Sequence, residues 1–268
     1  MRALIVGHQA DVSAMAVAAA LAARHGRDAV RHVDLAELTE ARWEHRIDSR
    51  GQAETRIAFR QEGPEHFDVV FHRIDDFSGL HFNGWSAADR DYGRTEWLAL
   101  LLSWLQSLGR RAVNRPSFGK LNVHDDRPWS WLHVASEIGF ATHPMGATTS
   151  TRAFPQDPTA VEHQAMAPDP WTTSTAIDRA RGYAAPVSAI SDVVVVGNQV
   201  FGEADPDARE KCLGLAHAAQ TDVLGIRLAR RAGAPEWRFV GANAAPPIAQ
   251  GTVLAALVAL LEHRAAGT

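Results

Sequence analysis

The chain has 268 residues, 46% of them hydrophobic, and carries 27 basic and 31 acidic side chains. The formal net charge of −4 provides no basic field, so no nucleic-acid partner is expected. A single cysteine, Cys212, excludes a disulfide framework, and no stretch approaches the roughly 20 apolar residues of a membrane span, so we expect a cytoplasmic protein with no membrane partner.

The first part of the chain is typical of an α/β unit. Asp11 or Ser13 is placed to cap an alanine-rich helix that ends near Gly26. Because strands precede and follow this helix, we expect a right-handed crossover in a parallel sheet. Gly7 is not followed by the glycines of a dinucleotide-binding fingerprint, so NAD is not inferred. The predicted strands cover residues 3–6, 29–35, 56–60 and 69–72.

The middle of the chain predicts two helices separated by a corner. Residues 95–108 and 127–139 have apolar side chains at helical spacing. Residues 112–113 predict a short strand that leads into Asn114. Residues 150–181 contain four prolines and scattered serine and threonine, and we expect mainly loop there.

The last part predicts a hairpin, two further strands and two helices. Gly197 and Asn198 form the expected hairpin turn. The hairpin strands cover residues 193–196 and 199–201, the helices 208–220 and 252–264, and the other strands 225–229 and 237–240.

Seven short motifs, in this order, resemble ATP-grasp proteins, specifically the branch that makes lactone and amide crosslinks in ribosomal peptides. The resemblance covers nearly the whole chain apart from its middle segment. The motifs are Val69-Val-Phe-His-Arg73, the acidic helix that carries Glu96, Val113-Asn114-Arg115-Pro116, Arg127-Pro128 with the following helix and Gly139-Phe-Ala-Thr-His-Pro144, the hairpin Val193-Val-Val-Val-Gly-Asn-Gln-Val-Phe201, Leu224-Gly-Ile-Arg-Leu-Ala229, and Phe239-Val-Gly-Ala-Asn-Ala244.

The resemblance implies a fold and a domain organisation. We expect the α/β class, with a pre-ATP-grasp, Rossmann-like domain in residues 1–115. A shortened ATP-grasp-like α+β domain would follow in residues 116–268, with the loop-rich segment 150–181 inside it. The implied partner is a peptide or a small anionic substrate, and a homo-oligomer or a complex with an intact ATP-grasp paralogue stays open.

The metal-binding positions of the family are altered. In the family, an aspartate on one late strand and a glutamate and an asparagine on the next hold the magnesium ions that bridge ATP phosphates. Here Arg227 matches the aspartate and Gly241 the glutamate, and only Asn243 remains. The nearest acid is expected to be Glu236, in the turn before the last strand. We therefore expect no cofactor and no metal site.

The lysines that bind phosphate in the family are altered too. Arg127 replaces the first of them, and its planar fork is not equivalent to a lysine point charge. The second belongs to the lid, and residues 150–181 contain no lysine.

Several side chains are candidates for binding a substrate, while no catalytic residue can be assigned. Arg227 either holds an anionic ligand, points outward into solvent or pairs with a surface acid. Arg73 and Glu96 match the resemblance and could form a buried pair beside the cleft, with either a structural or a binding role. His8 and Asp11 lie on the first strand–helix loop, where open α/β sheets bind ligands. The candidate set is Arg73, Glu96, Asn114, Arg127, Arg227, Asn243 and His8.

The leading hypothesis is a degenerate ATP-grasp-like protein of a peptide or amino-acid natural-product pathway. It would bind its substrate without Mg-ATP, as an accessory protein or as an enzyme with repurposed chemistry. The alternative is an active ATP-dependent carboxylate–amine ligase that uses ATP and magnesium with unusual ligands. A third hypothesis is a purely structural partner of an intact paralogue.

Overall fold

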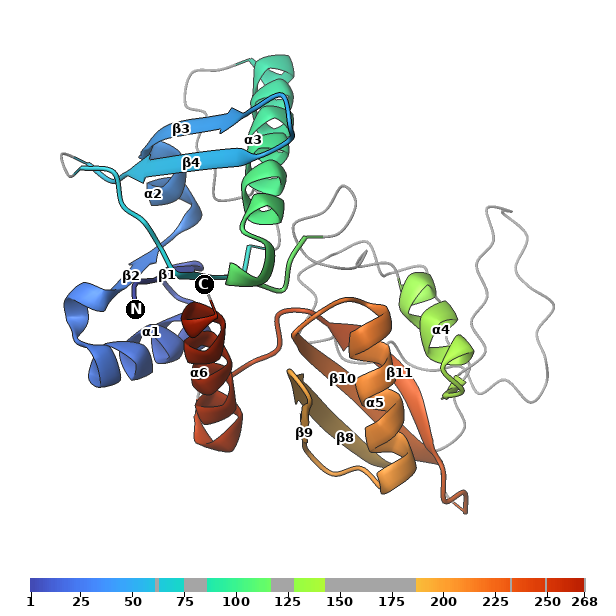
Figure 1. The fold of residues 1–268 in the computed structure, drawn as a ribbon. Coiled ribbons are helices and arrows are strands. Elements are labelled where there is room, and N and C mark those ends of the chain that lie inside the picture. Colours follow the sequence, from blue (N-terminus) through green and yellow to red (C-terminus); the bar gives the residue numbers. More distant parts are fainter. Residues whose placement is uncertain are drawn as a thin grey trace.

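The computed structural model describes most of the chain (Figure 1). The described residues are 1–60, 63–74, 86–116, 128–142, 187–231, 233–248 and 250–267. The predicted loop at 150–181 and the candidate Arg127 lie outside them.

A parallel sheet is built from the first part of the chain, as predicted, and it has four strands. The strand predicted at 56–60 lies outside it, in a separate antiparallel hairpin. The strand order of the parallel sheet is β2-β1-β5-β6. Asp11 caps the first helix by accepting hydrogen bonds from the backbone N–H groups of Ser13 and Ala14. Gly7 packs against this helix so closely that an added Cβ would lie 2.7 Å from the Ala14 Cβ. The elements are β1 (Ala3–Val6), α1 (Val12–His25), the 3₁₀ turn η1 (Arg27–Ala29), β2 (Val30–Val33), β5 (Val69–His72), the 3₁₀ turn η2 (Gly109–Arg111) and β6 (Ala112–Val113).

Both faces of this sheet are covered. One face packs against α1 and against the C-terminal helix α6 (Gly251–Ala266). The other face packs against a layer of α2 (Leu35–Glu40), α3 (Ala87–Ser107) and the antiparallel hairpin of β3 (Arg42–Ile47) and β4 (Ala53–Ala58). The α/β class that the sequence predicts is thereby confirmed.

A second, mixed sheet has the strand order β7-β11-β10-β8-β9. Helices α4 and α5 cover one of its faces around a core that includes Val193, Ile226 and Phe239. The hairpin turn at Gly197–Asn198 is confirmed. The elements are α4 (Pro128–Glu137), β7 (Ala141–Thr142), β8 (Val187–Val196), β9 (Gln199–Phe201), α5 (Pro206–Ala218), β10 (Val223–Arg231) and β11 (Trp237–Asn243).

Helix α6 joins the two sheets (Figure 1). Its Leu257, Val258 and Leu261 are fully or almost fully buried, in one cluster with residues of the first sheet and with Val196 of the second. A continuous core therefore crosses residue 115, and the domain boundary proposed there stays a prediction.

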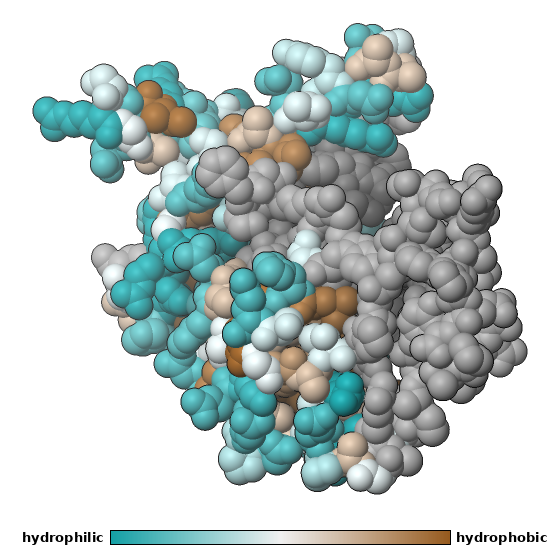
Figure 2. Space-filling model, turned by 90° about the vertical axis from the view of Figure 1, so that its right-hand side faces the viewer, coloured by the Kyte–Doolittle hydropathy of each residue, from teal (hydrophilic) through white to brown (hydrophobic). Residues whose placement is uncertain are grey.

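Surface hydrophobic side chains are scattered. In Figure 2 the described residues on the visible face are mainly hydrophilic, with hydrophobic ones in small separate groups. No helix among the described residues is long and apolar enough to span a membrane. Among the described residues the large exposed hydrophobic ones are Val12 and Met15, both on α1, and Ile47, Tyr92 and Ile190, each on another element.

Candidate functional site

A row of three residues crosses the second sheet and includes Arg227 and Gly241, two of the positions that the sequence analysis singled out. Arg227 on β10 is in register with Asp192 on β8 and with Gly241 on β11. Opposed residues on antiparallel strands point to the same face, so the three share one face. The neighbouring Ile226 and Leu228 point into the core of α4 and α5, which places the row on the opposite side.

Arg227 and Asp192 form a two-pronged ion pair. The Arg227 Nε donates to Asp192 Oδ1 at 2.7 Å, and Nη2 donates to Oδ2 at 3.2 Å. The expectation that Glu236 is the nearest acid is wrong, because Asp192 contacts Arg227 directly while Glu236 pairs with Arg238. Asp192 was not predicted from the sequence. It lies 35 residues before Arg227, and the two meet only through the register of β8 against β10.

These residues do not fit a magnesium site. Gly241 has no side chain, and Arg227 places a cation at the position that the sequence resemblance aligns with an acid. The Asn243 Oδ1 already accepts a hydrogen bond from the backbone N–H of Ala245 at 2.7 Å. No group of three or more histidine, cysteine, aspartate and glutamate side chains is arranged to hold a metal ion within the part of the chain that the structure describes. One carboxylate, that of Asp192, faces a guanidinium, and magnesium prefers several hard oxygen ligands.

Arg73 connects the first part of the chain to the last part through hydrogen bonds. Its Nε donates to Asp11 Oδ2 at 2.5 Å, and its Nη1 and Nη2 donate to the carbonyls of Pro246 and Ala245 at 2.9 and 3.2 Å. The expected Arg73–Glu96 pair is wrong, because Arg73 pairs with Asp11 while Glu96 is exposed on α3. For Arg73 to bind a substrate, its contacts with Asp11 and the two carbonyls would have to break.

Asn114 forms the corner that the sequence predicted, and it is buried. Its Nδ2 donates to the carbonyls of Val223 and Ala244 at 2.9 and 2.8 Å. Its Oδ1 accepts from the Thr221 hydroxyl and from the backbone N–H groups of Asp222 and Val223. Its φ of 56° lies in the left-handed region, which asparagine tolerates better than most residues. Every side-chain polar atom is engaged, so Asn114 holds the sheets together and offers nothing to a ligand.

The remaining candidate, His8, is accessible, whereas the single cysteine is not. His8 is exposed at the end of β1, where its Nδ1 accepts from the Ala10 N–H at 3.1 Å. Cys212 is buried in α5, and burial raises the pKa of its thiol to about 12, so thiolate chemistry is disfavoured at neutral pH. The residues that face outward from the altered metal positions are therefore Asp192, Arg227 and Asn243.

Comparison with known proteins shows the fold. No protein-family model and no curated protein sequence matches the chain. A RiPP-associated ATP-grasp ligase from Chryseobacterium gregarium, in complex with ADP and a leader and core peptide, is similar with a TM-score of 0.69 and 14% identity over 98% of this chain and 97% of that chain. The macrocyclase MdnC from Microcystis aeruginosa, bound with the precursor peptide MdnA, is similar with a TM-score of 0.73 and 13% identity over 97% of this chain and 99% of that chain. A RimK-domain ATP-grasp protein from Sphaerobacter thermophilus is similar with a TM-score of 0.52 and 15% identity over 98% of this chain and 100% of that chain.

These likenesses extend nearly end to end in both partners of each comparison. The resemblance to ATP-grasp proteins of the peptide-modifying branch is thereby confirmed at the level of the fold. At 13–15% identity the comparisons carry no residue roles over to this chain.

Proposed function

We propose that this chain is an ATP-grasp-like protein of a peptide or amino-acid natural-product pathway that binds a peptide without Mg-ATP. It would act as an accessory protein or as an enzyme with ATP-independent chemistry. The observation that supports the proposal is the Arg227–Asp192 ion pair, because Arg227 stands at the position that the sequence resemblance aligns with a magnesium-binding acid.

The charge of that face argues against the usual phosphoryl chemistry. In ATP-grasp enzymes the metal neutralises the phosphates during transfer. Arg227 is a fixed cation, but Asp192 balances its charge, and Asn243 and Gly241 add no acid. A divalent ion placed here would meet one carboxylate that is already paired and one guanidinium that repels it.

A peptide is favoured over a small anion as the substrate. Arg73 and Arg227, both candidates for gripping an anion, are each held by a carboxylate. Two of the similar structures are complexes with peptides, which supports a peptide ligand for a chain of the same fold.

The test is calorimetric titration of the purified protein with ATP, with and without magnesium chloride, beside an assay for ADP release in the presence of a random peptide library. We expect no heat of nucleotide binding and no ADP release. Magnesium-dependent ADP release that rises with peptide would overturn the proposal in favour of an active carboxylate–amine ligase.

A further inference from the structure

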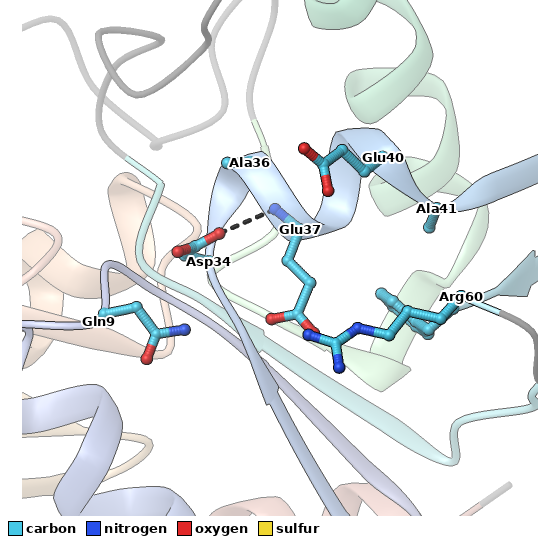
Figure 3. Close-up of a pocket in the computed structure, with 8 residues that line it drawn as sticks. Gln9, Asp34, Ala36, Glu37, Glu40, Ala41 and Arg60 are labelled. Carbon is cyan, nitrogen blue, oxygen red and sulfur yellow. Dashed lines mark hydrogen bonds and ion pairs between the residues drawn. The ribbon is translucent and has the colours of Figure 1, made fainter.

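A cavity of about 470 Å³ opens beside the first sheet, away from the row on the second sheet (Figure 3). It lies at the carboxyl ends of β1 and β2, between the β1–α1 loop, α2 and the end of β4. Small-molecule sites in proteins typically occupy roughly 300–1,000 Å³, and open α/β sheets bind ligands outside the carboxyl ends of their strands. Both size and position therefore make this cavity a candidate binding site.

The polar lining of the cavity carries more negative than positive charge. Asp34, Glu37 and Glu40 contribute three carboxylates, while Arg60 is the one cation among the described lining residues. The Arg60 Nη2 lies 3.9 Å from Glu37 Oε1, and its side chain is 83% exposed, so this pair is weak. Gln9 adds an amide, which faces Asp34 across the opening in Figure 3.

Two of the three carboxylates are not neutralised by a cation within the described structure. One oxygen of Asp34, Oδ1, accepts from the backbone N–H of Glu37 and caps α2, which leaves Oδ2 for another donor. Glu40 has no ion pair with a described residue, and it is exposed at the end of α2. A concave wall with uncompensated carboxylates attracts a cation with several N–H donors.

The apolar part of the lining fits the stem of such a cation. Ala36, Ala41 and Phe59 contribute carbon surface next to the carboxylates. Lysine and arginine bury their methylene stems on apolar surface while their charged heads stay with polar partners. The Phe59 ring is almost fully buried and already has the guanidinium of Arg31 4.9 Å from its centroid, so a ligand would contact its edge rather than that face.

We propose that this cavity binds a basic side chain, guanidinium or ammonium, of the peptide substrate. Asp34 and Glu40 neutralise its charge, and the Gln9 amide oxygen accepts one of its N–H groups. The inference rests on the proposed function for its peptide, but the site is defined by its own residues and is tested without the peptide.

The probe is Nα-acetyl-arginine methylamide, titrated at low salt into isotope-labelled protein and followed by amide chemical shifts. Its uncharged analogue, Nα-acetyl-citrulline methylamide, has nearly the same shape and serves as the matched ligand. We expect the arginine probe to shift the amide signals of Gln9, Glu37 and Arg60, and the citrulline probe to shift none of them. The expected dissociation constant of the arginine probe is about 1 mM or a few-fold weaker. We also expect the affinity to fall as sodium chloride is raised.

Two variants locate the site. Asp34→Asn keeps a good helix cap and removes the charge, and Glu40→Gln removes the second charge. We expect each to weaken the arginine probe about threefold, in line with exposed ion pairs of under 1 kcal/mol. Glu210→Gln, which removes an exposed carboxylate on α5, should leave the affinity unchanged.

Equal binding of arginine and citrulline, or equal affinity in the wild type and in the Asp34→Asn and Glu40→Gln variants, would overturn the cavity assignment. Either result would leave the proposed function standing, because that is tested with nucleotide. Conversely, magnesium-dependent ADP release would remove the proposed function without affecting the probe titration.

Discussion

Arg227 and Asp192 hold each other across neighbouring strands, with the guanidinium Nε 2.7 Å from one carboxylate oxygen and Nη2 3.2 Å from the other. The Arg227 side chain is 17% exposed and that of Asp192 46%, so the pair lies at the surface of the sheet. The sequence left open whether Arg227 binds an anion or pairs with an acid, and the structure has the acid pair. Two substitutions on this face, at Arg227 and at Gly241, would put acids at the positions that the sequence resemblance assigns to metal ligands.

Rebuilding the family's acids is expected to create affinity for a divalent cation. In an Arg227→Asp, Gly241→Glu double variant, Asp192 and the two new carboxylates would share one face with Asn243. Without metal, the like charges on adjacent strands should destabilise the variant by about 1 kcal/mol. Added Mn²⁺ should restore stability by binding the folded state, with a submillimolar dissociation constant measured by calorimetry.

The wild type and an Arg94→Asp variant, which alters an exposed arginine on α3, should show no Mn²⁺-dependent rise in melting temperature. A similar rise in the wild type would mean that its own residues already hold the ion, and the case against a metal site would fail.

Removal of the Asn114 side chain is expected to cost about 3 kcal/mol or more of unfolding free energy. Asn114→Ala would remove the side-chain partner of the Ala244 carbonyl and of the backbone N–H groups of Asp222 and Val223. Urea denaturation measures the loss. Asn198→Ala, at an exposed hairpin position, should change stability by about 0.5 kcal/mol or less. If both variants lost a similar amount of unfolding free energy, Asn114 would not hold the two sheets together as described.

Local patterns predicted most of the elements of the fold. The strand at Ala3–Val6 and the cap at Asp11 depend on neighbouring residues, and both lie where the sequence placed them. The hairpin strand β3 was not predicted, because its residues lack a clear apolar alternation. Trp43 stabilises β3 through edge-to-face contacts with Trp97 and Trp104, which come from a helix far along the chain. The start of α3 was also misplaced, because only its apolar stripe was used to predict it. The helix was predicted from residue 95, whereas it begins at Ala87 after the Ser86 cap, ahead of that stripe.

The candidate site was harder to predict than the fold. Motif order alone placed Arg227, Gly241 and Asn243 on adjacent strands, and that placement agrees with the register. Motif order cannot give the register between β8 and β10, so Asp192 was missed. The prediction of an Arg73–Glu96 pair was wrong because motif order does not show which loops lie side by side. The partner of Arg73 is Asp11, which caps α1 in the loop after the neighbouring strand β1.

The partner of Arg73 can be measured directly by double-mutant cycles. We expect a coupling energy of about 1–3 kcal/mol between Arg73→Ala and Asp11→Ala, because the pair is largely shielded from water. The cycle also cancels the cost of losing the Asp11 cap. Between Arg73→Ala and Glu96→Ala we expect coupling close to zero. A larger coupling to Glu96 than to Asp11 would restore the pairing that the sequence suggested.

His72 is expected to make the stability of the fold depend on pH. The side chain is buried, and its Nε2 donates to the Asn114 carbonyl at 2.9 Å, while Nδ1 has no partner among the described residues. Burial lowers the pKa of His72 to about 4, against an opposing effect of the hydrogen bond to Asn114. In the unfolded chain the pKa is about 6.5, so the unfolded state binds more protons between these two values. The stabilisation is present above pH 6.5 and is lost as the pH falls toward 4.

The size of this effect follows from the pKa difference. Between pH 7.5 and pH 5, His72 should cost the wild type about 2 kcal/mol of unfolding free energy. A His72→Gln variant keeps a donor for the Asn114 carbonyl but cannot be protonated, so it should lack this part of the pH dependence. Urea denaturation of both proteins at the two pH values isolates the difference, since all other titrating groups are shared. Identical pH slopes would mean that His72 is protonated equally in the folded and unfolded chains, which its burial beside Asn114 does not allow.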